Sequence, residues 1–187
     1  MVNRQFFERS SMEVAIDLGL RRLRFSKEGN LHVPEKTKEI LIIQTIPYGT
    51  ESGYEPETTT KGEIKSSVQA AMKTPGSIDM YHTRTGYVLA ISTDQEGKYS
   101  EVSIHSALPV SGFGNLSPRE LSDLLSGPTK LTRNLGIDKE VAQLLHGRPI
   151  HDNEFIEITK EKLPGTYKFD SKQISPSALG SFRFMRE

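Results

Sequence analysis

Apolar and polar positions at the start of the chain predict a helix followed by a strand. Ser10 or Ser11 is a typical helix N-cap, and Glu13 lies three residues after Ser10, as in a capping box. Apolar side chains then recur at helical spacing until Gly19, which is a typical helix end. Residues 20–25 alternate apolar and basic side chains, which indicates a strand with one face in water.

The next apolar run predicts a buried strand. Residues 40–46 are rich in β-branched side chains, and we expect Pro47 to end the strand, because proline has no N–H to donate to a sheet. Residues 49–67 are mostly Gly, Glu, Thr, Lys and Ser, which predicts a long surface loop, and residues 68–72 predict a short helix. Short turns between three further apolar runs favour an antiparallel meander: residues 77–81, 86–93 and 102–110.

Helices and then short strands are predicted after residue 116. Ser117 is expected to cap the first helix, with Pro118 at its first position, while Thr129 caps the second helix and Asp138 the third. Short apolar runs predict the final strands at residues 155–158, 167–169 and 182–185. No internal repeat interrupts the pattern, so we expect a single domain over residues 1–187.

Composition narrows the function classes. Lys and Arg total 24 and Asp and Glu total 24, so the formal net charge is zero, and residues 41–110 carry a net charge of −3. This balance disfavours a polybasic nucleic-acid binder but is compatible with a local basic patch. The absence of cysteine excludes disulfides, thiolate catalysis and thiolate metal sites. No secretory signal and no apolar run near the ~20 residues of a membrane helix are recognisable, which predicts an intracellular protein.

No single residue type by itself identifies a catalytic, metal or binding site. The five histidines lack metal-ligand spacing, so no metal is expected. The densest basic cluster is Arg21, Arg22 and Arg24, for which a solvated face is a simpler interpretation than phosphate contacts. Solvated charges are likewise the simpler interpretation for the acidic candidates Glu51, Glu55, Glu57 and Asp79. Core packing competes with stacking on a flat base for the tyrosines Tyr48, Tyr81 and Tyr87.

Several segments, taken in order, resemble one family. They are QFFERSSMEVAIDLGLRRL, TPGSIDMY, EVSIHSALPVSG, SGPTKLTRNLGID, GTYKFD and SFRFM. The family is that of the monofunctional 3-methyladenine (alkyladenine, methylpurine) DNA glycosylases, and the closest segment is residues 126–138, which is similar to GPGKLTKALGI.

The resemblance implies both a fold and an activity. The fold is mixed α/β (α+β), with flanking helices around a curved antiparallel sheet. The activity is that of a protein which binds double-stranded DNA, intercalates a side chain and rotates a damaged base into a pocket. We also expect the chain to be a monomer. In this family an ionised Glu activates the water that attacks the sugar C1′, aromatic side chains sandwich the alkylated base, and no metal or cofactor is required.

The resemblance also assigns site residues, with a mismatch at the centre. The family's catalytic E-T-E-A-Y segment corresponds to residues 44–48, so Tyr48 takes a base-stacking position but Ile46 stands where the catalytic Glu is expected. A shifted register makes Glu51 the candidate catalytic carboxylate. The other assignments are Tyr81, Ala90 and His105 in the base pocket, with Thr83, Arg84 and Lys130 at the DNA contact and intercalation point.

Two functional hypotheses follow. The first is a divergent DNA glycosylase in which Glu51 or another loop carboxylate replaces the missing Glu. The second is a non-catalytic relative that uses the fold to bind nucleic acid or a protein partner. The zero net charge leaves a third interpretation, in which the chain binds no DNA.

Overall fold

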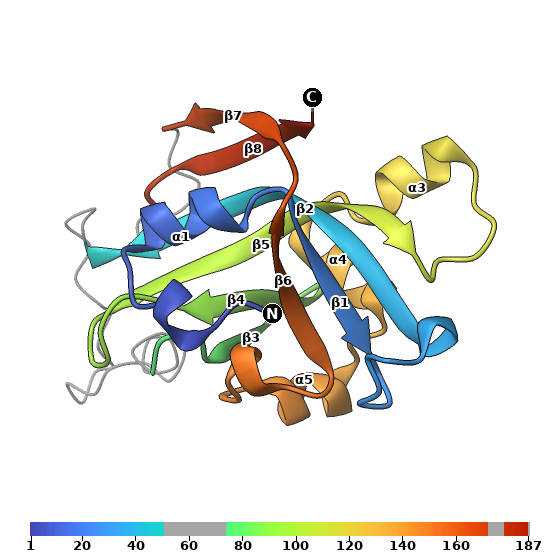
Figure 1. Cartoon of the computed structure of the whole chain (residues 1–187), viewed down its shortest axis with the longest axis horizontal. Helices are drawn as coiled ribbons and strands as arrows, with labels where there is room; N and C mark the ends of the chain where they lie inside the picture. Colours follow the sequence, from blue (N-terminus) through green and yellow to red (C-terminus); the bar gives the residue numbers. More distant parts are fainter. Residues whose placement is uncertain (51–73, 172–177, 187) are drawn as a thin grey trace.

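The strands form one continuous antiparallel sheet (Figure 1). The computed structural model describes residues 1–50, 74–171 and 178–186. The strands are β1 (Arg21–Ser26), β2 (Thr37–Gly49), β3 (Ile78–Thr83), β4 (Gly86–Ser92), β5 (Ser100–Ser111), β6 (Ile156–Lys162), β7 (Gly165–Asp170) and β8 (Ser181–Arg186). The main path across the sheet runs β3-β4-β5-β2-β1-β6. Strand β8 pairs with β2 beyond the end of β1, and β7 pairs with β8.

Helix starts agree with the capping residues of the sequence, with one exception. The helices are α1 (Ser11–Leu18), α3 (Pro118–Leu124), α4 (Pro128–Leu135) and α5 (Lys139–Leu145), with short 3-10 turns η1 (Arg4–Phe6), η2 (Pro34–Lys36) and η4 (Ile150–Asp152). The predicted caps Ser10, Ser117 and Asp138 are confirmed. The prediction for Thr129 was wrong, because Pro128 takes the first helical position and the N-cap is therefore Gly127.

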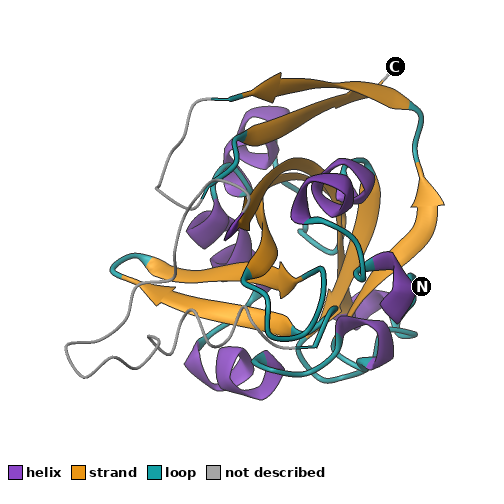
Figure 2. Cartoon of the chain, turned by 90° about the vertical axis from the view of Figure 1, so that its left-hand side faces the viewer, coloured by secondary structure: helices purple, strands orange, loops and turns teal. Residues whose placement is uncertain are grey.

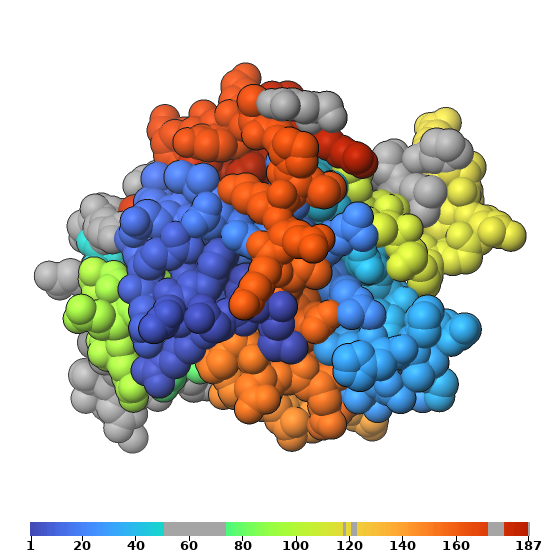
Figure 3. Space-filling view, in the orientation of Figure 1, coloured from blue at the N-terminus to red at the C-terminus, as the bar shows by residue number. Residues whose placement is uncertain are grey.

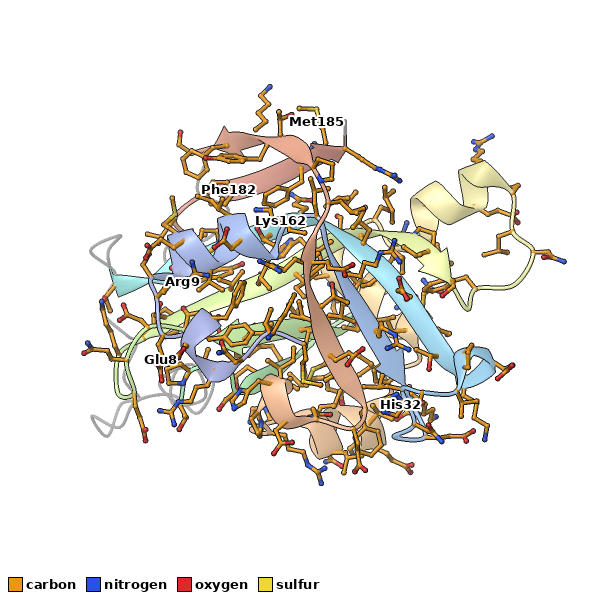
Figure 4. The ribbon with its side chains drawn as sticks, viewed as in Figure 1. Glu8, Arg9, His32, Lys162, Phe182 and Met185 are labelled. Carbon is orange, nitrogen blue, oxygen red and sulfur yellow. The ribbon has the colours of Figure 1, made fainter. Side chains whose placement is uncertain are left out.

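The hydrophobic core lies between one face of the sheet and helices α1, α4 and α5. It includes Leu18 of α1, Leu131 of α4 and Leu145 of α5, all fully buried. Figure 2 shows the strands curving around the helices. Polar contacts also fix α1, because Asp17 forms ion pairs with Arg9 (2.7 Å) and Lys162 (3.6 Å), two residues labelled beside this helix in Figure 4.

Strand β2 is longer than predicted at both ends. The expectation that Pro47 ends the strand was wrong, since β2 runs to Gly49 and Pro47 pairs with Val102 of β5. The Pro47 carbonyl accepts a hydrogen bond from the Leu179 N–H (2.9 Å). The N–H and C=O of one residue point to the same side of a strand, so the side that lacks a donor faces Leu179 rather than β5.

Strands β7 and β8 form a ribbon whose two faces differ. One face carries Tyr167, Phe169, Phe182 and Phe184, whose rings contact one another. Phe184 packs directly on Gly19, where a Cβ would lie 2.1 Å from its ring. The segment leading from β6 into β7 crosses the N-terminal residues, as orange over blue in Figure 3, and the Val2 N–H donates to the Ile158 carbonyl of β6 (2.9 Å).

Candidate active site

The sheet face opposite the core gathers most of the predicted pocket residues. Directly paired residues of antiparallel strands point to the same face. The pairing register therefore makes a row across four strands: Asp79 of β3, Ala90 of β4, Ser103 of β5 and Ile46 of β2. Neighbours one residue away, such as Thr45 and Val102, point to the other face, where the Thr45 hydroxyl donates to the Ala15 carbonyl of α1.

Glu101 lies at the centre of this face. Its register partners are Ser92 of β4 and Tyr48 of β2, so it occupies the row next to Ile46. The Tyr81 hydroxyl of β3 donates a hydrogen bond to Glu101 Oε2, and the Tyr99 side chain also bonds to this carboxyl group. Only 4% of Glu101 is exposed. The two tyrosines predicted to stack on a base thus flank one buried carboxyl group.

The environment of Glu101 favours its protonated form. The pKa of Glu101 is raised from 4.5 to about 8. Burial is the largest cause and the nearby Asp79 charge adds to it, while the hydrogen bonds from Tyr81 and Tyr99 oppose the rise. Burial also raises the pKa of Tyr81 and of Tyr48, and in both cases the Glu101 charge adds to the effect. A perturbed carboxyl group beside aromatic rings is typical of functional sites.

Asp79 is a second buried carboxyl group on this face. The interpretation of Asp79 as a solvated charge was wrong, because its side chain is fully buried. The Ser92 hydroxyl donates to Asp79 Oδ2 (3.1 Å), and His146 Nδ1 lies 3.6 Å from Asp79 Oδ1. The charge of Asp79 lies close enough to Glu101 to raise the pKa of that carboxyl group.

Ile46 and Ala90 are buried and line this face without supplying a polar group. Ile46 is 1% exposed and Ala90 is fully buried, and neither belongs to the core cluster between sheet and helices. The loop candidates Glu51, Glu55 and Glu57, together with the predicted helix at residues 68–72, lie outside the described residues.

His105 lies at a bulge between two rows. Gln44 pairs with Ser106 and Thr45 with Ile104, so His105 is the extra residue of β5. Burial lowers the pKa of His105 to about 4. The imidazole is therefore neutral near pH 7.

The predicted DNA-contact residues lie at the β3–β4 turn and at the start of α4. Thr83 pairs with Gly86 across the turn, and Arg84 is exposed at its tip. The two elements touch, since the Thr85 hydroxyl donates to Thr129 Oγ1 (3.3 Å). Lys130 is exposed but forms an ion pair with Asp123 (2.8 Å).

Sequence reasoning missed Glu101 and Tyr99. The sequence does contain one signal for Glu101. It stands at the start of EVSIHSAL, a run of mainly apolar and small residues, and an acidic residue inside a strand is costly unless it has partners. Its importance depends on pairing with Tyr48 and on contact with Tyr81, both of which join residues far apart in sequence. Among the described residues no group of three or more His, Asp or Glu side chains is arranged to hold a metal ion.

These features define a mixed α/β protein with an antiparallel sheet, one face of which carries a carboxyl group among tyrosines. The family model for methylpurine-DNA glycosylase (MPG) matches residues 5–173. The chain therefore belongs to the methylpurine-DNA glycosylase family. Over 99 residues it is 33% identical to a protein of Enterococcus faecalis named "Putative 3-methyladenine DNA glycosylase"; this match covers 51% of the chain and 41% of that protein. No described helix is long and apolar enough to cross a membrane.

Proposed function

We propose that the protein excises alkylated purines from DNA by hydrolysing the N-glycosidic bond, with Glu101 as the carboxyl group that acts on water. The observation that carries this proposal is the position of Glu101 between Tyr48 and Tyr81, one row from Ile46. The carboxyl group missing at position 46 is thus supplied on the same face by the adjacent strand. Membership of the methylpurine-DNA glycosylase family supports the substrate class.

The proposed reaction transfers one proton, forms a bond between the water oxygen and the sugar C1′, and breaks the N-glycosidic bond. Water attacks the sugar C1′ as the N-glycosidic bond breaks, the base leaves with the bonding electron pair, and Glu101 accepts the proton of the water. Glu101 must be ionised for this step, although its raised pKa keeps it largely neutral in the unliganded protein near pH 7. An alkylated purine that carries a positive ring charge lowers that pKa when it enters, because an opposite charge stabilises the carboxylate.

The remaining site residues bind and orient the substrate in this proposal. Tyr48 and Tyr81 offer aromatic faces to an electron-poor base, and base–aromatic stacking contributes about 1–3 kcal/mol per base. Thr83 and Arg84 contact the duplex where the base is rotated out, next to Lys130 at the start of α4. Their placement at two touching elements supports a shared DNA contact.

Release of free base from defined duplexes tests the proposal. The substrates are duplexes that contain 3-methyladenine, hypoxanthine or 1,N6-ethenoadenine, and the variants are Glu101→Gln and, as a matched control, Glu140→Gln on the exposed surface of α5. We expect release by the unsubstituted chain and by Glu140→Gln, and loss of release in Glu101→Gln. A Glu51→Gln variant distinguishes between the two candidate carboxylates. If Glu51→Gln is inactive and Glu101→Gln is active, then Glu51 is the group that acts on water.

The pH profile separates proton transfer from a merely structural role. The free-enzyme parameter kcat/KM should rise with pH through an apparent pKa near 8, because Glu101 must lose its proton. The rise in kcat should occur at lower pH for a cationic base, since the bound substrate favours the carboxylate. A profile without this limb, in an otherwise active protein, refutes Glu101 as the base.

One observation favours a second candidate function. Ile46 is fully buried at the position where the family carries its catalytic Glu, and it is unable to accept a proton. A non-catalytic relative that binds nucleic acid, or a protein partner, through the same face is consistent with this substitution. Duplex binding without release of any of the three bases would favour this second function.

A further inference from the structure

A second row of polar residues crosses the same sheet face, away from the tyrosines. Residues paired in register place on it Lys168 of β7, Arg183 of β8, Gln44 of β2, Ser106 of β5 and, through an isolated bridge, Ser126. Gln44 alternates with Thr45, whose hydroxyl faces α1, and therefore shares the face of Ile46 and Tyr48. The row borders a groove of about 430 Å³.

The two cations of the groove lie directly opposite each other. Lys168 and Arg183 are register partners on neighbouring strands, and like charges in this arrangement destabilise a sheet. Neither side chain forms an ion pair within the described part of the chain. By contrast, Arg22 and Arg24 of β1 pair with Glu39 (2.7 Å) and Glu157 (2.6 Å). Lys168 and Arg183 therefore repel each other, and among the described residues the acidic side chain that shares their face of the ribbon is Asp170, two positions beyond Lys168.

The other residues of the groove offer hydrogen-bond donors to an anion. The Ser106 hydroxyl donates to Gln44 Oε1 (3.0 Å), which leaves the Gln44 amide NH₂ as a donor beside Arg183. Arg and Lys with a neutral donor match the charge and geometry of a phosphate group. At the Ser126 end of the row, Asp123 already accepts from Ser126 (3.1 Å) and pairs with Lys130.

We propose that this groove binds a backbone phosphodiester of the DNA strand whose base occupies the Tyr48–Glu101–Tyr81 site. The proposal rests on the proposed function for the choice of DNA as ligand. Gln44 and Tyr48 are four residues apart on β2, which is about 14 Å along a strand. One DNA strand carries a phosphate about every 3.4 Å along the duplex axis, so one strand spans both sites.

Salt-dependent duplex binding tests the groove. The perturbed variant is Lys168→Ala/Arg183→Ala, and the matched control is Lys139→Ala/Lys160→Ala, which removes the same charge from exposed lysines on α5 and β6. Each phosphate contact contributes about −0.9 to the slope of log K against log salt. We expect the slope to become shallower by about 1.8 in the groove variant and to stay unchanged in the control. The charge-preserving variant Lys168→Arg/Arg183→Lys should keep the original slope.

Separate measurements identify the source of the phosphate and test the enzyme activity. Titration with inorganic phosphate, followed by the NMR shift of the Arg183 guanidinium, should show only weak binding that the duplex displaces. The proposal is overturned if the groove variant leaves the salt slope of duplex binding unchanged. If inorganic phosphate also binds strongly in that case, the groove is a site for a free anion. Base release with an unchanged slope refutes the groove but not the glycosylase; an altered slope without base release refutes only the glycosylase. Absence of duplex binding at low salt overturns both.

Discussion

Replacing Glu101 by Gln should remove a large pH-dependent term from the stability of the protein. The folded-state pKa of Glu101 is about 8 against an ordinary 4.5, because burial disfavours the charged form. Between these values the folded protein holds a proton that the unfolded chain has released, so the free energy of unfolding falls as pH rises. The contribution is complete below pH ~4.5 and is lost as pH rises through about 8. Its size is about 1.4 kcal/mol per pH unit, or about 5 kcal/mol in total.

Urea denaturation of the protein and of Glu101→Gln between about pH 5 and about pH 8 measures this term. The glutamine oxygen still accepts from Tyr81 and Tyr99, so the two proteins should have similar stabilities at pH ~5. The variant should become the more stable protein as pH approaches ~8. The exposed Glu140→Gln variant should follow the unsubstituted protein throughout. Parallel stability curves for Glu101→Gln and the unsubstituted protein would show that Glu101 is not buried in the form described.

Three further changes probe the same face and the helix beside the core. Burial lowers the pKa of His105 from 6.5 to about 4, so up to about 3 kcal/mol of stability is present above pH ~6.5 and is lost as pH falls toward ~4. In urea titrations, His105→Gln should reduce this loss of stability at acid pH. Ile46→Glu, which buries a further carboxyl group near Glu101, should cost on the order of 3–5 kcal/mol at pH ~8 and less at pH ~5, against about 1 kcal/mol for Ile46→Val, in thermal denaturation. Ser10→Ala removes the capping box with Glu13 and should cost about 1 kcal/mol, and an unchanged melting temperature would contradict that role.

The elements of the fold were predictable because their signals are local. Ser10, Ser117 and Asp138 each accept from a backbone N–H three residues later, so a few letters of sequence determine where the helix begins. Pro47 shows the limit of such reasoning. Whether a proline ends a strand depends on which side its missing N–H faces, and that side is defined by Leu179, which is remote in sequence.

The centre of the candidate site was not predictable, because it depends on register. Glu101 acquires its raised pKa from burial beside Tyr48 on β2 and from the charge of Asp79 on β3, while the hydrogen bond from Tyr81 on β3 opposes the rise. A shift of one residue in the β2–β5 pairing would turn Glu101 to the core and leave Tyr48 without it. The family resemblance located Tyr48, Ile46, Tyr81, Ala90 and His105 on neighbouring strands of the sheet, but it offered no carboxyl group at the centre.

The zero net charge weighs less against DNA binding once the charges are placed in the fold. The acidic excess of residues 41–110 includes Asp79 and Glu101, which are buried. With a pKa of about 8, Glu101 contributes little negative charge to the surface near pH 7. Lys168 and Arg183, which form no ion pair with another described residue, come from the C-terminal ribbon, whose β8 strand carries the labelled Phe182 and Met185 in Figure 4. Because the potential that a DNA strand meets is set by exposed charges near its path, a neutral chain can present a cationic groove on the same face as its buried carboxyl groups.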